Sequence, residues 1–323
     1  MTEQLKIAVL DDYLGVAQAL ADWDHLGAAV TVFPDTIGGP ALVERLAPFD
    51  VICLMRERTP FPADLIAALP RLRLIVTSGK RNLAIDLAAA KARGITVCGT
   101  ESRGPATAQH TLGLILAANR CLVSEALSVR DGGWQRSLGR DLDGLTLGLI
   151  GLGRLGAEVA TLTRPLGVRL VAWSQNLTEA RAAGVGVERM PTLSALMAAS
   201  DTVSIHLVLS ERSRGLIDAA ALAGMKPDAV LVNTSRGPIV ETEALLAALR
   251  AGRLGAAALD VFDTEPLPLD DPLRDRALID AGKLILTPHI GYGSRQTYEI
   301  FYRQTVEAIA AWKAGNPIRE LRL

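Results

Sequence analysis

The 323-residue sequence lacks several features that would mark a specialised class of protein. Its formal net charge is only -1, so no overall field would draw it to nucleic acid or to an anionic membrane, and neither is expected as a partner. Its three cysteines, Cys53, Cys98 and Cys121, show no Cys-x-x-Cys spacing, which predicts small core residues in a reducing compartment and no metal site. No uninterrupted apolar run approaches the length of a membrane span. A soluble cytoplasmic protein is therefore the prediction.

Repeats of solenoid period and low-complexity segments are also missing, and the chain shows alternation instead. Short apolar runs alternate with alanine- and leucine-rich segments of helical spacing, which predicts parallel sheets covered by helices on both faces. The predicted strands of the first series are residues 5–10, 29–33, 50–55, 72–77 and 95–98. Those of the second series are residues 145–150, 168–173, 202–207, 229–233, 255–261 and 284–287.

The two series predict two domains rather than one very wide sheet. A break near Gly104 and Pro105 separates them, and one long apolar helix is expected over residues 106–129. The last helical stretch, about residues 294–314, is expected to return to the first domain. We therefore predict an α/β fold in which residues 104–290 are inserted into a domain formed by residues 1–103 and 291–323, with a cleft between the two sheets.

Residues 144–160 are typical of a buried strand, a glycine turn and the first turn of a helix. The pattern Gly-x-Gly-x-x-Gly is met by Gly151, Gly153 and Gly156. In this pattern the glycines allow a tight turn, close approach of the backbone to a pyrophosphate, and close packing of helix on strand. The helix, which starts with Arg154 and Leu155, would direct its free N–H groups at the phosphates. The inserted domain is thus predicted to be a dinucleotide-binding Rossmann domain, and the other a flavodoxin-like substrate domain.

The residues after the second strand of this domain bear on the choice of cofactor. The strand ends at Trp173 and continues as Ser174-Gln175-Asn176, where many NAD-dependent proteins have a carboxylate that binds the ribose hydroxyls and repels a 2′-phosphate. Hydroxyl and amide groups can accept a 2′-phosphate, although no arginine follows at once. The predicted cofactor is NAD(P), and Ser174 favours NADP.

Three residues of the second half suit hydride transfer to a keto acid. Arg236 follows a strand end and can bind a carboxylate with two donors, the alternative being a surface salt bridge. His289 is a candidate proton donor to a carbonyl oxygen, or else a structural histidine. Glu265 can hold the imidazole and favour its protonated form. His206, inside a predicted strand, is expected to be a structural histidine, and the sequence shows no partner for His25 or His110.

Five ordered stretches resemble the D-2-hydroxyacid dehydrogenase family, which includes phosphoglycerate dehydrogenases and glyoxylate/hydroxypyruvate reductases. They are residues 151–156, 201–206, 233–237, 258–267 and 287–291. The resemblance implies a D-specific hydride transfer between NAD(P)H and a small 2-keto or 2-hydroxy acid. It assigns Arg236 to the substrate, His289 to acid–base catalysis and Glu265 to orienting His289.

The same resemblance assigns binding residues. Asp260 would hold the nicotinamide carboxamide, while Thr234 and Ser235 would line its ribose. In the first domain, the backbone N–H groups of a loop formed by Ser78, Gly79 and Lys80 would meet the substrate carboxylate. A second cation would come from Arg56, with Arg58 as an alternative. The segments Gly79-Lys80-Arg81-Asn82 and Gly291-Tyr292-Gly293-Ser294 depart from better-known members, so the substrate is not specified.

The helix after Pro105 and the segment 132–134 resemble the dimer-forming region of the family, which implies a homodimer through the cofactor domain. Two alternatives to the dehydrogenase stay open at this point. A dinucleotide-sensing regulator with little turnover would be expected to carry a partner-binding extension, and none is predicted at either end. A formate dehydrogenase is disfavoured because its relatives pair the catalytic histidine with glutamine, where this chain has Glu265.

Overall fold

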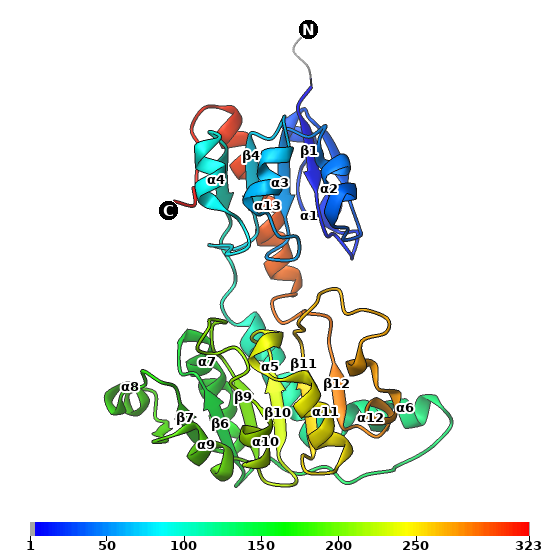
Figure 1. The fold of residues 1–323 in the computed structure, drawn as a ribbon, viewed down its shortest axis with the longest axis vertical. Helices are drawn as coiled ribbons and strands as arrows, with labels where there is room; N and C mark the ends of the chain where they lie inside the picture. Colours follow the sequence, from blue (N-terminus) through cyan, green and yellow to red (C-terminus); the bar gives the residue numbers. More distant parts are fainter. Residues whose placement is uncertain (1–3, 323) are drawn as a thin grey trace. The chain divides into compact units, whose positions relative to one another are not determined.

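The computed structural model describes residues 4–322 and divides into two compact units (Figure 1). The first unit is Met1–Arg103 together with Ser294–Leu323, and the second is Gly104–Gly293. Each unit has its own parallel sheet.

The first unit contains a five-stranded sheet in the order β2-β1-β3-β4-β5. Its strands are β1 (Lys6–Val9), β2 (Ala29–Val32), β3 (Val51–Leu54), β4 (Leu74–Thr77) and β5 (Thr96–Gly99). Its helices are α1 (Ala17–Leu20), η1 (Asp24–Leu26), α2 (Gly39–Leu46), α3 (Ala63–Ala68), α4 (Leu87–Ala92) and α13 (Arg295–Lys313). A buried apolar core joins the sheet to α2, α3 and α4, while α13 packs on β4 and β5. The strand order is that of flavodoxin.

The second unit contains a seven-stranded sheet in the order β12-β11-β10-β9-β6-β7-β8. Its strands are β6 (Thr146–Ile150), β7 (Arg169–Trp173), β8 (Glu188–Arg189), β9 (Thr202–Ile205), β10 (Val230–Asn233), β11 (Ala256–Leu259) and β12 (Leu284–Leu286). Its helices are α5 (Ala106–Asn119), α6 (Leu122–Arg130), α7 (Arg154–Thr163), η2 (Arg164–Leu166), α8 (Glu179–Gly184), α9 (Leu193–Ala199), α10 (Ala219–Ala223), η3 (Gly237–Ile239), α11 (Thr242–Arg250), η4 (Pro272–Arg274) and α12 (Arg276–Asp280). One core lies between the sheet and α5 and α7, and another lies between the sheet and α9, α10 and α11.

The sheet order of the second unit is the doubly wound order of a Rossmann fold with one further strand at the edge. The predicted fold class, a Rossmann domain inserted into a flavodoxin-like domain, is confirmed. All the predicted strands are present. Only β8 was not predicted, because its two polar residues form no apolar run.

The single helix predicted over residues 106–129 is wrong, because α5 and α6 are separate helices bent by 66°. The break lies at Arg120 and Cys121, and Cys121 has a φ of 55°, in the left-handed region. Instead of continuing the helical pattern, Asn119 O accepts the N–H of Arg140 at 2.7 Å. A Cβ on Gly139 would lie 2.6 Å from the Arg120 Cα, so the returning chain packs directly on the break. These contacts are tertiary, which explains why the local pattern did not predict the bend.

No single helix in the described chain is long and apolar enough to span a membrane; only α5 and α6 taken together, as a bent pair, have the required length and composition.

The cysteines differ in burial. Cys53 and Cys98 are buried in β3 and β5, and burial raises the pKa of both thiols, that of Cys98 to about 11. Cys121 is only half-buried, because it lies at the break between α5 and α6 rather than inside a helix.

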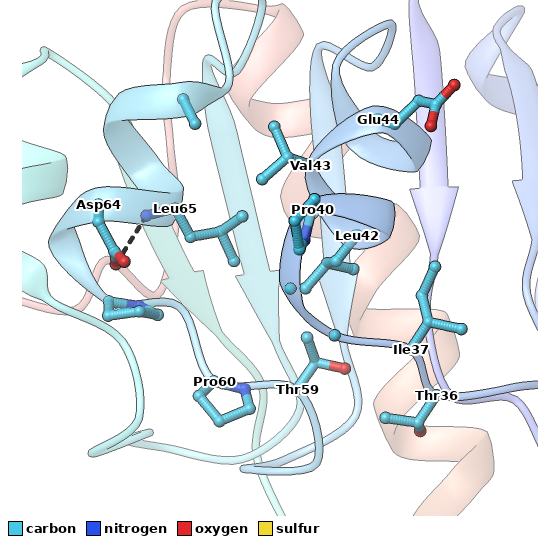
Figure 2. Close-up of a pocket in the computed structure, with 14 residues that line it drawn as sticks. Thr36, Ile37, Pro40, Leu42, Val43, Glu44, Thr59, Pro60, Asp64 and Leu65 are labelled. Atoms are coloured by element: carbon cyan, nitrogen blue, oxygen red, sulfur yellow. Dashed lines mark hydrogen bonds between the residues drawn. The ribbon is translucent and has the colours of Figure 1, made fainter.

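A groove of about 770 Å³ lies between α2 and α3 in the first unit (Figure 2). Apolar side chains such as Leu42, Val43 and Leu65 form much of its lining. None of the residues predicted to bind substrate lines it.

Candidate active site

Three neighbouring strands of the second unit end level with one another. The register pairs Leu259 of β11 with Asn233 of β10 on one side and with Leu286 of β12 on the other. The loops that follow these strands carry the three predicted catalytic residues. Because parallel strands present their carboxyl ends at the same edge of a sheet, the three loops start side by side at that edge.

Glu265 and His289 form a direct pair. Glu265 Oε2 lies 2.6 Å from His289 Nδ1, while Glu265 Oε1 accepts the N–H of Phe262 at 2.9 Å. A carboxylate facing Nδ1 places the imidazole hydrogen on that nitrogen and leaves Nε2 for a reacting group. The ring of Tyr292 meets the His289 ring edge to face, with 5.8 Å between centroids. The imidazole is thus held on two sides, with its side chain 23% exposed.

The turn that carries His289 is anchored by Asp260. His289 has a φ of 51°, an uncommon conformation for a residue with a side chain. Asp260 Oδ1 accepts the Thr287 hydroxyl at 2.6 Å and the Ile290 N–H at 2.9 Å. Its Oδ2 accepts the Gly291 N–H at 2.8 Å. One buried carboxylate therefore bridges the chain on both sides of the histidine and stabilises its strained backbone.

His110, for which the sequence showed no partner, belongs to the same cluster. Its Nε2 lies 3.2 Å from Thr287 Oγ1 and 3.2 Å from Asp260 Oδ1. Burial raises the pKa of Asp260, but hydrogen bonds from His110 and Thr287 outweigh it and bring that pKa below its usual value. Asp260 is therefore ionised at neutral pH. His110 lies on α5, far from Asp260 along the chain, so no local motif could have revealed this contact.

Arg236 lies in the loop after β10. The Asn233 side chain fixes this loop by donating to Arg236 O at 2.9 Å and by accepting the Ser235 N–H at 3.0 Å. The guanidinium donates to Ser235 O at 2.7 Å. A Cβ on Gly237 would lie 2.2 Å from the carbonyl carbon of Phe262, so only glycine lets this loop pack on the next one. The packing places the Arg236 loop against the loop that contains the predicted catalytic glutamate.

The two residues predicted to line the ribose already have protein partners for their hydroxyls. Thr234 Oγ1 shares a hydrogen bond of 2.8 Å with Thr111 Oγ1. The Ser235 hydroxyl donates to Leu207 O.

The glycine turn fits a pyrophosphate. Gly151 has a φ of 99°, and a Cβ on Gly156 would lie 2.2 Å from Gly151 O, so both positions require glycine. A Cβ on Gly153 would meet nothing within 4 Å, which shows open space beside the backbone. The N-terminus of α7 has no side-chain cap, and its first N–H groups, including those of Arg154 and Leu155, are left for an anion.

His206 lies directly against this turn, with its carbonyl oxygen 2.7 Å from where a Gly151 Cβ would be. Both ring nitrogens are shielded from solvent and make no hydrogen bond within residues 4–322. Burial lowers the pKa of His206 to about 4, so the side chain is neutral in the folded protein.

The lowered pKa of His206 predicts that the folded protein loses stability in mild acid. Its pKa falls from 6.5 in the unfolded chain to about 4 in the folded one, so the unfolded state takes up the proton first. Stability should drop as the pH falls below 6.5, by about 2 kcal/mol between pH 7 and pH 5. Urea unfolding at both values measures this loss, which His206→Gln should reduce. An equal loss in the variant would contradict the assignment.

In the first unit, Arg56 rather than Arg58 contacts the predicted substrate loop. The Arg56 N–H donates to Ser78 Oγ at 2.8 Å, and its Nη1 donates to Ser78 O at 3.3 Å. A Cβ on Gly79 would lie 1.9 Å from Arg56 Nη1, and this glycine has a φ of 95°. Arg58 instead donates to Asp11 O at 2.9 Å.

Two of the three N–H groups predicted to bind substrate are already used within the first unit. Ser78 donates to Leu54 O at 3.0 Å, and Gly79 donates to Thr100 Oγ1 at 2.8 Å. The N–H of Lys80 makes no hydrogen bond to any residue that the structure describes. The Lys80 ammonium lies 2.7 Å from a Glu101 carboxylate oxygen.

Comparison with known proteins agrees with this arrangement. Residues 112–291 match the family model described as "D-isomer specific 2-hydroxyacid dehydrogenase, NAD binding domain". The chain is 34% identical over 285 residues to glycerate dehydrogenase of Methylorubrum extorquens, covering 85% of this chain and 86% of that one. It is also 34% identical over 285 residues to D-3-phosphoglycerate dehydrogenase of Mycobacterium leprae, covering 87% of this chain but 53% of the relative. The chain thus spans about half the length of the phosphoglycerate dehydrogenases that it matches.

A solved structure shows the same likeness across both units. The phosphoglycerate oxidoreductase from Vibrio cholerae has a TM-score of 0.89 and 35% identity, covering 97% of this chain and 100% of that one. The residues matched by the family model lie in the second unit, which also contains the glycine turn and the Glu265–His289 pair. The chain therefore belongs to the D-isomer specific 2-hydroxyacid dehydrogenase family.

Proposed function

We propose that this protein transfers a hydride between a nicotinamide dinucleotide and a small 2-keto or 2-hydroxy acid, with D stereochemistry. The observation that carries this proposal is the 2.6 Å pair of Glu265 and His289 at the carboxyl edge of a sheet whose glycine turn fits a dinucleotide. The names of the relatives described above support the same class of reaction. The regulator alternative has no support among them.

The protein supplies the proton chemistry of this reaction. A bound nicotinamide cofactor would supply or accept the hydride. In the reducing direction, His289 Nε2 gives a proton to the carbonyl oxygen as charge develops there, and it takes the proton back during oxidation. Glu265 accepts from Nδ1 throughout, so the ring keeps its orientation as the proton leaves and returns. The residues that hold the cofactor would be the glycine turn, the N-terminus of α7 and the loop after β10.

Cations and one backbone donor would bind the substrate. Arg236 would bind the carboxylate or carbonyl of the acid through its guanidinium fork. From the first unit, Arg56 and the N–H of Lys80 would bind the carboxylate, because Arg56 lies on the Ser78–Gly79 turn and the Lys80 N–H makes no hydrogen bond within residues 4–322. We propose NADPH over NADH, since Ser174 has no charge to repel a 2′-phosphate, and this choice favours the reducing direction.

A substrate screen tests the proposed reaction. The purified protein is mixed with NADPH or NADH and with glyoxylate, hydroxypyruvate or pyruvate, and the loss of reduced cofactor is followed. We expect turnover with at least one of these acids, and a D product from those that give a chiral alcohol. Tight cofactor binding with no turnover on any of them would contradict the proposal and favour the regulator.

We also propose a homodimer formed through α6 and the segment after it. This region exposes four large apolar side chains, which are Leu122, Val129, Trp134 and Leu138. Exposed apolar patches of this kind mark interaction sites. Light scattering should give twice the chain mass of 34.3 kDa, and the double variant Trp134→Ser, Leu138→Ser should shift the mass towards the monomer. A monomer mass for the unaltered protein would refute the dimer.

A further inference from the structure

The loop after β7 has no charge of its own. It consists of Ser174, Gln175 and Asn176, which offer a hydroxyl and two amides but no carboxylate. The register pairs Ile150 of β6 with Trp173 of β7, so this loop starts level with the glycine turn. In a doubly wound dinucleotide domain, the position after the second strand is where the adenosine ribose is recognised. The structure places two arginines, Arg181 and Arg212, at the glycine turn and at this loop.

Arg212 is the first of these cations. It comes from the loop after β9, and its Nη1 donates to Gln175 Oε1 at 3.4 Å. Its side chain is exposed, and no carboxylate in residues 4–322 forms an ion pair with it. Its guanidinium is therefore held at the ribose loop by a neutral amide, with its charge available to an anion.

Arg181 is the second cation. It lies in α8, which follows the ribose loop, and its Nε donates to Leu152 O at 3.0 Å. Leu152 is part of the glycine turn, so Arg181 joins this turn to α8. No ion pair of Arg181 with a carboxylate occurs within the described chain.

Two other arginines of these elements form ion pairs with carboxylates. Arg154, at the start of α7, lies 2.9 Å from a Glu158 carboxylate oxygen. Arg189, on β8, lies 3.1 Å from a Glu179 carboxylate oxygen. The two cations without such partners, Arg181 and Arg212, are those that contact the glycine turn and the ribose loop.

We propose that Arg181 and Arg212 bind the 2′-phosphate of NADPH, with the Ser174 hydroxyl as a further donor. An arginine fork suits a phosphate, and two guanidinium groups, one at the glycine turn and one at the uncharged loop, would favour the doubly charged group over a ribose hydroxyl. This assignment rests on the proposed function, because it assumes that the glycine turn binds a nicotinamide dinucleotide.

Binding of oxidised cofactors to the protein without substrate tests this assignment directly. NADP⁺ and NAD⁺ differ only in the 2′-phosphate, so the ratio of their Kd values by titration calorimetry isolates the group in question. We expect NADP⁺ to bind about tenfold or more tightly, with the ratio falling as salt is added. Arg212→Gln should lower the ratio about tenfold, and Arg212→Lys should retain part of it.

The matched control is Arg253→Gln. Arg253 is an exposed arginine just before β11, at the opposite end of the sheet, and its loss should leave the ratio unchanged. Because Arg181 also contacts the glycine turn, Arg181→Gln is judged by the same ratio and not by affinity for NADP⁺ alone.

The outcomes separate this assignment from the proposed function. Equal affinities for the two cofactors, or an unchanged ratio in the double variant Arg181→Gln, Arg212→Gln, would overturn the assignment. If NADH then supports reduction of a 2-keto acid, the proposed function stands. If neither cofactor binds, both the 2′-phosphate assignment and the proposed function are wrong.

Discussion

Replacement of His289 by alanine is expected to lower kcat by about 10³-fold, because the carbonyl oxygen loses its positioned proton donor. The Kd of the reduced cofactor should stay nearly unchanged, since the glycine turn and α7 do not depend on this side chain. Steady-state kinetics with the best acid of the screen, together with fluorescence titration of the cofactor, measure both quantities. Full activity in the variant would show that another group gives the proton.

Glu265→Gln is the matched test of the second member of the pair. The glutamine oxygen can still accept from His289 Nδ1 and keep the ring in its orientation, while the charge beside the ring is lost. The amide nitrogen then faces the Phe262 N–H, which loses its acceptor. We expect a smaller loss of kcat than in His289→Ala and a displaced pH profile. The same loss as in His289→Ala, with an unchanged profile, would mean that Glu265 does not act through the imidazole charge.

The second large effect is expected from Asp260→Ala, which removes the anchor of the His289 turn. The Thr287 hydroxyl and the N–H groups of Ile290 and Gly291 would lose their acceptor in a buried place. Unsatisfied buried donors each cost free energy, so we expect the free energy of unfolding to fall by about 3 kcal/mol or more. The kcat should fall as well, because the strained φ of His289 is no longer held. Guanidinium unfolding and steady-state kinetics measure the two effects.

The control for this prediction is Asp263→Ala. Asp263 lies in the same loop as Asp260, but it is exposed and outside the anchoring cluster. Both stability and kcat should stay close to those of the unaltered protein. Comparable losses in the two variants would show that Asp260 has no special anchoring role.

The fold was predictable because each buried strand of the sheets forms an apolar run with clear borders. The run at β6 and the glycines after it also fixed the place of the dinucleotide turn, since Gly151 and Gly156 have backbone roles that no other residue can fill. The break at Cys121 was not predictable, because it depends on Arg140 and Gly139 packing from a distant part of the chain onto a helix of uniform composition.

The site was predictable where its residues follow strand ends within ordered motifs. Glu265 and His289 were expected to be partners, and the structure brings them together. The cluster of His110, Asp260 and Thr287 that supports them could not be predicted from the sequence, because His110 lies on α5, far from the other two residues along the chain. Arg181 and Arg212 were missed because spacing along the chain does not show their contacts: Arg181 donates to Leu152 O in the glycine turn, and Arg212 donates to Gln175 in the ribose loop.

In the proposed reaction, a hydride moves from the nicotinamide cofactor to carbon 2 of a keto acid while His289 gives the proton to the carbonyl oxygen. Reaction of NADPH deuterated at the transferring position, followed by mass spectrometry and chiral analysis of the product, tests it most directly. We predict a labelled D-2-hydroxy acid from the unaltered protein and almost none from His289→Ala in the same time. An unlabelled product, or equal labelling by the variant, would contradict the account.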